Sequence, residues 1–95
     1  SGIIENKAYP DLLKQNFPNP FQITTTISFE LPNPEFASLT IRNCLGQKLV
    51  ILVNGKLSEG THSFEWNAKT YPSGIYYYSL QLGDRNFTKR MILIN

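Results

Sequence analysis

Apolar and polar residues alternate along most of this chain with the period of two that places successive side chains on opposite faces of a β-strand. In the stretch TISFEL, for instance, Ile27, Phe29 and Leu31 share one face, and the residues between them are polar. No stretch keeps the 3.6-residue period of an amphipathic helix over ten residues. The alternation therefore predicts an all-β chain, with strands at 25–31, 37–44, 48–53, 60–67, 75–82 and 86–94.

Turn signals separate these stretches at intervals of about 8 to 12 residues, a spacing typical of small β-sandwiches. Asn54-Gly55 is the dipeptide that most readily adopts positive φ in a two-residue turn, so it predicts a hairpin after residue 53. Lys89 interrupts the apolar face of the last stretch, which indicates either a bulge or a strand at the edge of a sheet. Since a single sheet would leave half of the aromatic side chains in water, two packed sheets are expected. With a further short strand near Phe21, we predict an immunoglobulin-like antiparallel β-sandwich of about seven strands.

Residues 15–21, QNFPNPF, break the alternation near the start of the chain. The two prolines lack a backbone N–H and fix φ, so this block cannot extend a sheet as a regular strand, and the two asparagines can close local turns with their side chains. We expect Phe17 and Phe21 to pin the block onto the sandwich, each burial contributing roughly 1.5 to 3 kcal/mol, with the larger contribution from Phe21. The block is thus interpreted as a rigid structural motif made by Asn16, Pro18, Asn19, Pro20 and Phe21.

The composition fits one small folded domain and argues against two classes of function. The 95 residues are 41% apolar and 17% charged, which is enough apolar content for a single modest core. Nine Lys and Arg residues against seven Asp and Glu residues give a formal net charge of +2, and the basic residues are scattered, so no nucleic acid is expected as a partner. The longest uninterrupted apolar run, 49–53, is far shorter than the roughly 20 residues of a membrane-spanning helix, so no membrane-spanning segment is expected.

Candidate catalytic and metal-binding residues are few. Cys44 and His62 are the only pair that could act as nucleophile and base. His62 alternates with Phe64 and Trp66, which favours a half-buried structural histidine, and Cys44 is interpreted as a small core residue. The sequence contains no Cys-x-x-Cys, no paired histidines, no acidic loop with calcium spacing and no glycine-rich phosphate loop. We therefore expect no catalytic residue, no metal, no cofactor and no enzymatic activity in this domain.

The run Tyr76 to Tyr78 raises the alternative of a glycan-binding platform, because exposed aromatic rings stack on sugars. Alternation turns two of the three tyrosines inward, and Tyr77 alone does not form a platform. Trp66 is instead expected to anchor the core, and Gly60 to let the chain turn into the strand that carries this tryptophan.

Six short motifs follow one another from the opening block to the end of the chain. They are Asn-x-Pro-Asn-Pro-Phe at 16–21, Leu-Gly at 45–46, Gly-Thr-His at 60–62, Trp66, Ser-Gly-x-Tyr at 73–76 and Lys-Arg-Met-x-Leu at 89–93. In this order they resemble the type A C-terminal sorting domain of proteins that are exported by the type IX (Por) secretion system of Bacteroidetes bacteria. The resemblance runs from about Leu12 to Asn95, which is nearly the whole chain.

The resemblance implies a secretion signal at the end of a larger cargo protein, which the signal directs across the outer membrane. The cargo is in the periplasm in transit and then reaches the cell surface or the extracellular medium, and the signal domain is commonly cleaved off. The implied partners are the outer-membrane translocon, a shuttle protein and a sortase-like peptidase. Residues 1–11 are then expected to be a remnant of cloning followed by a linker from the cargo, and residues 12–95 to be the sorting domain.

The last strand carries the residues that the resemblance assigns to recognition by the translocon. Carried over position by position, these are Lys89, Arg90, Met91, Leu93 and Asn95, and the turn glycines of the family fall on Gly46, Gly60 and Gly74. The chain departs from the usual family pattern at Arg42, Asn43 and Asn95, where an aromatic, an acidic and a basic residue are common. We expect the machinery to read the edge of the terminal strand, by strand addition or by contact between its basic side chains and an acidic partner.

Two other functions fit the sequence. The patterns Gly-x-His-x-x-x-Trp and Ser-Gly-x-Tyr are shared with an immunoglobulin-like structural module that resembles the flagellar hook-capping protein, although that family lacks the opening block. An accessory glycan-binding module of a secreted enzyme would need an exposed aromatic cluster. An exposed strand edge would also allow self-association with a second copy of the chain.

Overall fold

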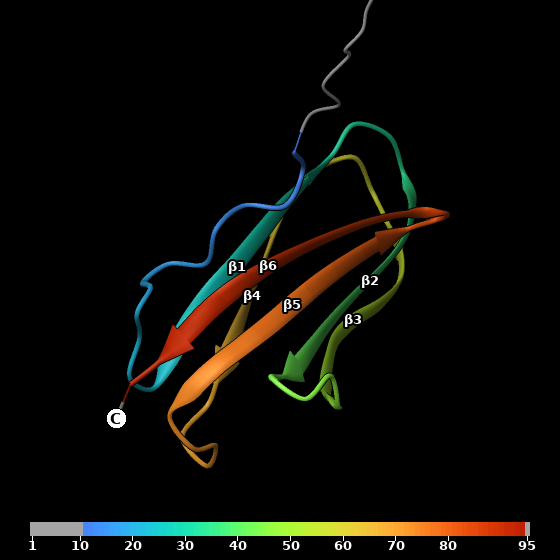
Figure 1. Ribbon diagram of the computed structural model, residues 1–95. Helices are drawn as coiled ribbons and strands as arrows, with labels where there is room; N and C mark the ends of the chain where they lie inside the picture. The colour runs from blue at the N-terminus through green and yellow to red at the C-terminus, as the bar shows by residue number, and fades with distance from the viewer. Residues whose placement is uncertain (1–10, 95) are drawn as a thin grey trace, which may run out of the picture.

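The computed structural model describes residues 11–94, which form six β-strands and no helix (Figure 1). The strands are β1 (Thr24–Leu31), β2 (Glu35–Asn43), β3 (Lys48–Leu57), β4 (Gly60–Asn67), β5 (Gly74–Leu82) and β6 (Arg85–Leu93). Each lies where the alternation of polar and apolar residues predicts a strand, so the all-β class is confirmed. In this part of the chain no helix is long and apolar enough to cross a membrane.

The strands pair into two antiparallel sheets that pack as a sandwich. β1 pairs with β4, and the larger sheet has the order β3, β2, β5, β6. The β2–β3 and β5–β6 connections are hairpins within the larger sheet, whereas the other connections carry the chain from one sheet to the other. The predicted antiparallel sandwich is therefore confirmed with six strands. In place of the short strand expected near Phe21, the structure has a single parallel bridge between Phe21 and Leu93.

The core lies between the two sheets and is built from the inward faces that the alternation predicts. In β1 the odd-numbered residues from Thr25 to Leu31 are buried, and in β5 the even-numbered residues from Tyr76 to Leu82 are buried. Trp66 of β4 is also buried, and its ring centroid lies 5.4 Å from that of Tyr76 in an edge-to-face arrangement. The aromatic side chains of both sheets thus meet in one apolar cluster.

The hairpin predicted at Asn54-Gly55 is wrong. β3 continues through both residues to Leu57, and they lie opposite Ser38 and Ala37 of β2. The pairing with β2 extends to its first residue, Glu35, which lies opposite Leu57. Continued pairing therefore satisfies more backbone N–H and C=O groups than a turn at Asn54 would. The following strand, β4, belongs to the other sheet, so the chain has to cross between the sheets after β3 instead of folding back on it.

β6 is an edge strand, and it carries no bulge. Its register with β5 runs without interruption from Arg85 to Leu93. Of the two interpretations of Lys89, the edge strand is confirmed and the bulge is wrong. Lys89 has the same parity as the buried Met91, and its position at the edge lets the ammonium group reach the rim of the sandwich, where it forms an ion pair.

The turn between β2 and β3 is organised by Asn43. Its side-chain Oδ1 accepts a hydrogen bond from the N–H of Leu45 at 2.9 Å. Gly46 follows with φ of 86°, a left-handed conformation that glycine adopts without steric cost. Gly60 and Gly74 also have positive φ, 119° and 152°, and begin β4 and β5.

Candidate functional site

Of the described residues, those before β1 form an extended segment that lies alongside β1 and ends beside β6 (Figure 1). We call residues 11–23 the lead-in segment. Its first half is hydrogen-bonded to the free edge of β1: the N–H of Lys14 donates to Ser28 O at 2.9 Å, and Phe17 and Thr26 exchange two backbone hydrogen bonds of 3.0 and 2.9 Å. This half therefore extends the smaller sheet.

The second half of the lead-in segment crosses to β6. The N–H of Phe21 donates to Ile92 O at 3.0 Å, and the N–H of Ile94 donates to Phe21 O at 2.8 Å. The side chain of Asn19 accepts a hydrogen bond from the N–H of Ile92 at 3.0 Å. The lead-in segment thus joins β1 of one sheet to β6 of the other, and we call this side of the sandwich the closed side.

The two prolines of the opening block fit this crossing. The peptide bonds before Pro18 and Pro20 are both cis. Neither proline has an N–H that would need a partner while the chain passes from one sheet to the other. The expectation that both asparagines close local turns holds for Asn16, whose Nδ2 donates to Pro18 O at 3.1 Å. It is wrong for Asn19, whose side chain instead accepts from β6.

The two phenylalanines of the block have opposite environments. Phe21 is 2% exposed and packs against Trp66, with ring centroids 5.9 Å apart. Phe17 is 79% exposed, so the expectation that it pins the block to the sandwich is wrong. The reason is its register: Phe17 pairs with Thr26, which faces solvent, and residues directly opposite each other in antiparallel strands share a face.

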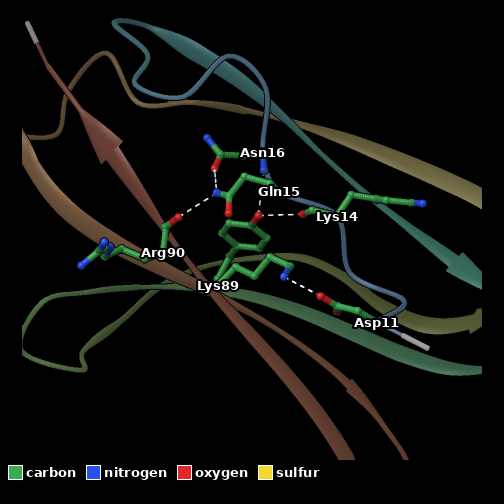
Figure 2. A network of polar contacts seen from close by, with 7 residues as sticks. Asp11, Lys14, Gln15, Asn16, Lys89 and Arg90 are labelled. Carbon is green, nitrogen blue, oxygen red and sulfur yellow. Dashed lines mark hydrogen bonds and ion pairs between the residues drawn. The ribbon is translucent and has the colours of Figure 1, made fainter. Parts of the chain in front are cut away.

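A buried tyrosine hydroxyl fastens the lead-in segment to β5. The hydroxyl of Tyr78 donates to Lys14 O at 2.7 Å and accepts from the N–H of Asn16 at 2.8 Å; Figure 2 shows these contacts from close by. Asn16 is itself buried, and its side chain also donates to Thr25 Oγ1 at 2.9 Å. Burial raises the pKa of Tyr78 to about 12, an effect that the hydrogen bond from Asn16 partly opposes. The phenol therefore stays neutral near pH 7 and can keep donating its proton to Lys14 O.

Charged and amide side chains tie the lead-in segment to the second half of β6. Nζ of Lys89 lies 2.6 Å from Oδ2 of Asp11, and Nε2 of Gln15 donates to Arg90 O at 2.8 Å. In Figure 2 the side chain of Lys89 points toward Asp11, while that of Arg90 points away from this contact. Since neighbouring residues of a strand face opposite ways, the two cations present their charges on different sides of β6.

The sequence-predicted recognition residues thus fall into three groups. Lys89 and Arg90 carry charges at the surface, whereas Met91 and Leu93 are fully buried core residues. Asn95 lies outside the described residues. The structure brings this terminal motif together with the opening block, although the two are separated by about 70 positions in the sequence.

Sequence reasoning missed Asp11, Gln15 and Thr25, and the role of the Tyr78 hydroxyl. One signal was available, because a tyrosine predicted to point inward needs a buried partner for its hydroxyl group. The alternation of polar and apolar residues did not indicate which backbone groups would bind this hydroxyl. The exposed polar contacts of Asp11 and Gln15 left no sequence signal.

The residues considered for catalysis do not form a site. Cys44 is exposed and not part of the core, since it lies in the turn that follows β2, where the alternation has ended. His62 belongs to β4, its Nε2 lies 2.8 Å from Ser58 O, and its ring packs beside Phe29 at a centroid distance of 5.7 Å. Among residues 11–94 no group of three or more His, Cys, Asp or Glu side chains is placed to hold a metal ion.

Comparison with known protein families gives one result that covers most of the chain. Residues 15–95 match the model of the secretion system C-terminal sorting domain family, so the match includes both the opening block and the terminal strand. A comparison with curated proteins gave no match. The chain therefore belongs to the secretion system C-terminal sorting domain family, whose members are the C-terminal signals for export of cargo proteins by the type IX secretion system.

Proposed function

We propose that the export machinery recognises this domain as a folded unit, and that it reads the closed side, where the lead-in segment lies on β6. The observation that carries the proposal is the pairing of the two motifs. Phe21 and Asn19 of the opening block are hydrogen-bonded to Ile92 and Ile94 at the end of the chain. A partner that binds here contacts both motifs at once, whereas an unfolded tail would present only one of them.

Recognition by charge is better supported than recognition by strand addition. On the outer edge of β6, the C=O of Arg90 and both backbone groups of Ile92 are already hydrogen-bonded to the lead-in segment. A partner strand would have to displace that segment, including the buried Phe21, before it could pair there. The guanidinium group of Arg90 is exposed and accessible as it stands. The ammonium group of Lys89 has only to exchange its contact with the exposed Asp11 for a carboxylate of the partner, so both charges suit an acidic partner.

The remaining recognition residues take a different role in this proposal. Met91 and Leu93 are buried, so they act by holding β6 on the sandwich and thereby keep Lys89 and Arg90 in place. Asn95 is retained as a contact residue on the family resemblance alone. Burial of Leu12 and Leu13 supports a sorting domain at 12–95. We propose that residues 1–11 are the linker from the cargo and that a sortase-like peptidase acts there.

The proposed route follows from membership of the family. The sorting signal implies interaction with secretion machinery and delivery of the cargo to the cell surface or the medium. We propose that the partners are the outer-membrane translocon and its shuttle protein, that the precursor is in the periplasm in transit, and that the domain is removed after export. The domain itself is proposed to have no enzymatic activity, since its role is to be recognised.

The test is export of a fluorescent reporter that carries a signal peptide and ends in residues 3–95, in a type IX competent strain and in its translocon-deficient twin. Export of the wild-type fusion is expected only in the competent strain. Lys89→Ala/Arg90→Ala should lower export at least tenfold, while urea unfolding of the purified chain shows a loss of no more than about 1 kcal/mol, the upper value for the exposed ion pair with Asp11. Lys69→Ala, a change at an exposed loop lysine, should export like wild type.

Two results would overturn the proposal. Export of the wild-type fusion in neither strain would remove the sorting function itself. Undiminished export of Lys89→Ala/Arg90→Ala would show that the charges on β6 are not read. Met91→Ala provides a further comparison. Its export defect should result from its loss of stability, so export should recover when the cells are grown at a lower temperature.

A further inference from the structure

Charge is divided unevenly between the two sheets. The four strands of the larger sheet contain six Lys or Arg residues and one acidic residue, Glu35, which is already paired with Arg85 at 3.0 Å. The two strands of the smaller sheet contain Glu30 and Glu65 and no Lys or Arg. The small net charge of the chain conceals this division, which gives the larger sheet a positive surface.

Part of that charge forms a row across the larger sheet, and the β2–β3 pairing shifts its register next to this row, between Ile41 and Arg42. The registers place Lys48 of β3 opposite Arg42 of β2, Arg42 opposite Tyr77 of β5, and Tyr77 opposite Arg90 of β6. We call these four residues the basic row. It lies on the outer face, because the neighbouring residues Ile41 of β2, Tyr76 and Tyr78 of β5, and Met91 of β6 are buried in the core. With about 4.8 Å between adjacent strands, the row is roughly 14 Å long.

The members of the row are accessible to a partner. Lys48 and Arg90 are exposed, Tyr77 is 36% exposed, and Arg42 is partly exposed. Among residues 11–94 the two ion pairs are Arg85 with Glu35 and Lys89 with Asp11, so neither neutralises a cation of the row. The positive potential therefore remains available to an external group.

The fold does not benefit from this arrangement. Like charges directly opposite each other on neighbouring strands are destabilising, and Arg42 lies directly opposite Lys48. Within residues 11–94 the cations of the row form no ion pair that would offset this cost, which favours an external anionic partner.

The surroundings of the row favour a protein as that partner. Ile75 and Ile92 flank it on one side and Ile51 on the other, and Ile75 and Ile51 are 41% and 49% exposed. Arg and Tyr side chains beside exposed apolar groups are typical of protein interfaces. One cation per strand is not the dense patch that binds nucleic acid, and Tyr77 alone is no platform for stacked bases.

We propose that the basic row is a docking surface for an acidic protein face, with carboxylates opposite Lys48, Arg42 and Arg90 and apolar groups against Tyr77 and the isoleucines. It extends the recognition surface from β6 across the whole larger sheet. The proposal rests on the proposed function only where it identifies the acidic partner as a component of the export machinery. The preference for an acidic protein surface follows from the residues of the larger sheet.

The first test measures binding of the full 95-residue chain to poly-L-glutamate, used as an acidic polypeptide, with a DNA duplex and anionic phospholipid vesicles as competing probes. Arg42→Glu/Lys48→Glu should weaken binding of poly-L-glutamate at least tenfold. Lys56→Glu/Lys69→Glu makes the same change of net charge at exposed residues outside the row and outside the closed side, and should weaken it less than threefold. Arg42→Lys should retain most of the affinity, and NMR shifts should map to the outer face of the larger sheet.

Equal losses in the two charge-reversal variants, or no binding at low salt, would overturn the proposal. Tighter row-dependent binding to DNA or vesicles than to poly-L-glutamate would overturn the choice of a protein partner. Because Arg42 and Lys48 are both reversed, the like-charge contact between them is preserved, so the urea midpoint should change little.

The second test places Arg42→Glu/Lys48→Glu in the export reporter, with Lys89 and Arg90 intact. Export reduced at least fivefold, with Lys56→Glu/Lys69→Glu exported normally, is expected. If the row variant is exported normally in a strain that exports the wild type through the translocon, the export machinery does not recognise the row. The proposed function would then still stand. Should the wild type not be exported at all, the proposed function fails, and the binding measurement still decides what the row binds.

Discussion

The two sides of the sandwich protect their strand edges in different ways. On the closed side, the lead-in segment is hydrogen-bonded to β1 and to β6. On the opposite side, β3 and β4 are the outer strands of their sheets within residues 11–94. There, register shifts interrupt the pairing of β3 with β2, and Lys48 and Lys56 carry charge near the two ends of β3. Bulges and edge lysines discourage pairing with other chains, so one side is covered by the chain and the other is kept irregular and charged.

This difference explains where the sorting motifs lie. The irregular side needs only local features of β2 and β3, whereas the closed side needs two distant segments to meet. Both the opening block and the terminal motif belong to the closed side. The self-association expected from the sequence remains a prediction, and the open edges of β3 and β4 are where it would take place.

The strongest way to break the closed side is to remove Phe21. Phe21→Ala deletes a buried ring that contacts Trp66, and it should lower the free energy of unfolding by about 3 to 5 kcal/mol. Phe17→Ala is the matched control, because Phe17 is 79% exposed, and its effect should stay within about 0.5 kcal/mol. Urea unfolding of the two variants measures the difference. Equal losses, or a larger loss at Phe17, would contradict the structural account of the block.

Removing one hydroxyl tests how the lead-in segment is fastened. Tyr78→Phe leaves the buried N–H of Asn16 without its acceptor and Lys14 O without its donor, and should cost about 1 to 3 kcal/mol. Tyr77→Phe removes a partly exposed hydroxyl on the outer face and should cost less than about 0.5 kcal/mol. Urea unfolding measures both, and faster hydrogen exchange at the Asn16 amide should accompany the first. A neutral Tyr78→Phe would show that water or another group replaces the bond.

The contrast between the two sides also marks how far the sequence predicts the molecule. Periodicity identifies the strands and the inward faces of β1 and β5, because these depend on residues close in sequence. It does not identify the hydrogen bonds from Phe21 to Ile92 and Ile94, which depend on where two distant segments meet. Asn54-Gly55 fails for a related reason: local turn preference is outweighed by a pairing partner on β2 that the local sequence does not contain.

The candidate site shows the same limit. The motifs could be located in the sequence, but whether they touch could not. The exposure of Phe17 follows from its pairing with solvent-facing Thr26, a register that the alternation of polar and apolar residues does not encode. The basic row is likewise invisible in the sequence, since its four members come from four strands and align only through the registers of the larger sheet.

Alkaline pH offers a graded way to loosen the closed side. The pKa of Tyr78 is raised from 10.0 to about 12 by burial, and that of Tyr76 is raised in the same direction by burial. Because the folded pKa lies above the unfolded value, the neutral phenol stabilises the fold fully below pH 10, and this contribution is lost as pH rises from 10 to 12. Urea midpoints at pH 9, 10, 11 and 12 should fall more steeply for wild type than for Tyr78→Phe. Parallel curves would show that the Tyr78 hydroxyl does not govern this loss.

The smallest expected effect on stability comes from the ion pair at the rim. The side chains of Lys89 and Asp11 are 25% and 58% exposed, so their contact should contribute only about 0.2 to 1 kcal/mol, and less at high salt. A double-mutant cycle with Lys89→Ala and Asp11→Ala, measured by urea unfolding at low and high salt, gives the coupling. A coupling above about 2 kcal/mol would show that Lys89 serves mainly to stabilise the fold and not to contact the machinery. A small coupling together with a large export defect in Lys89→Ala would separate the two roles, because a side chain that contributes little to folding and much to export must act through contact with the machinery.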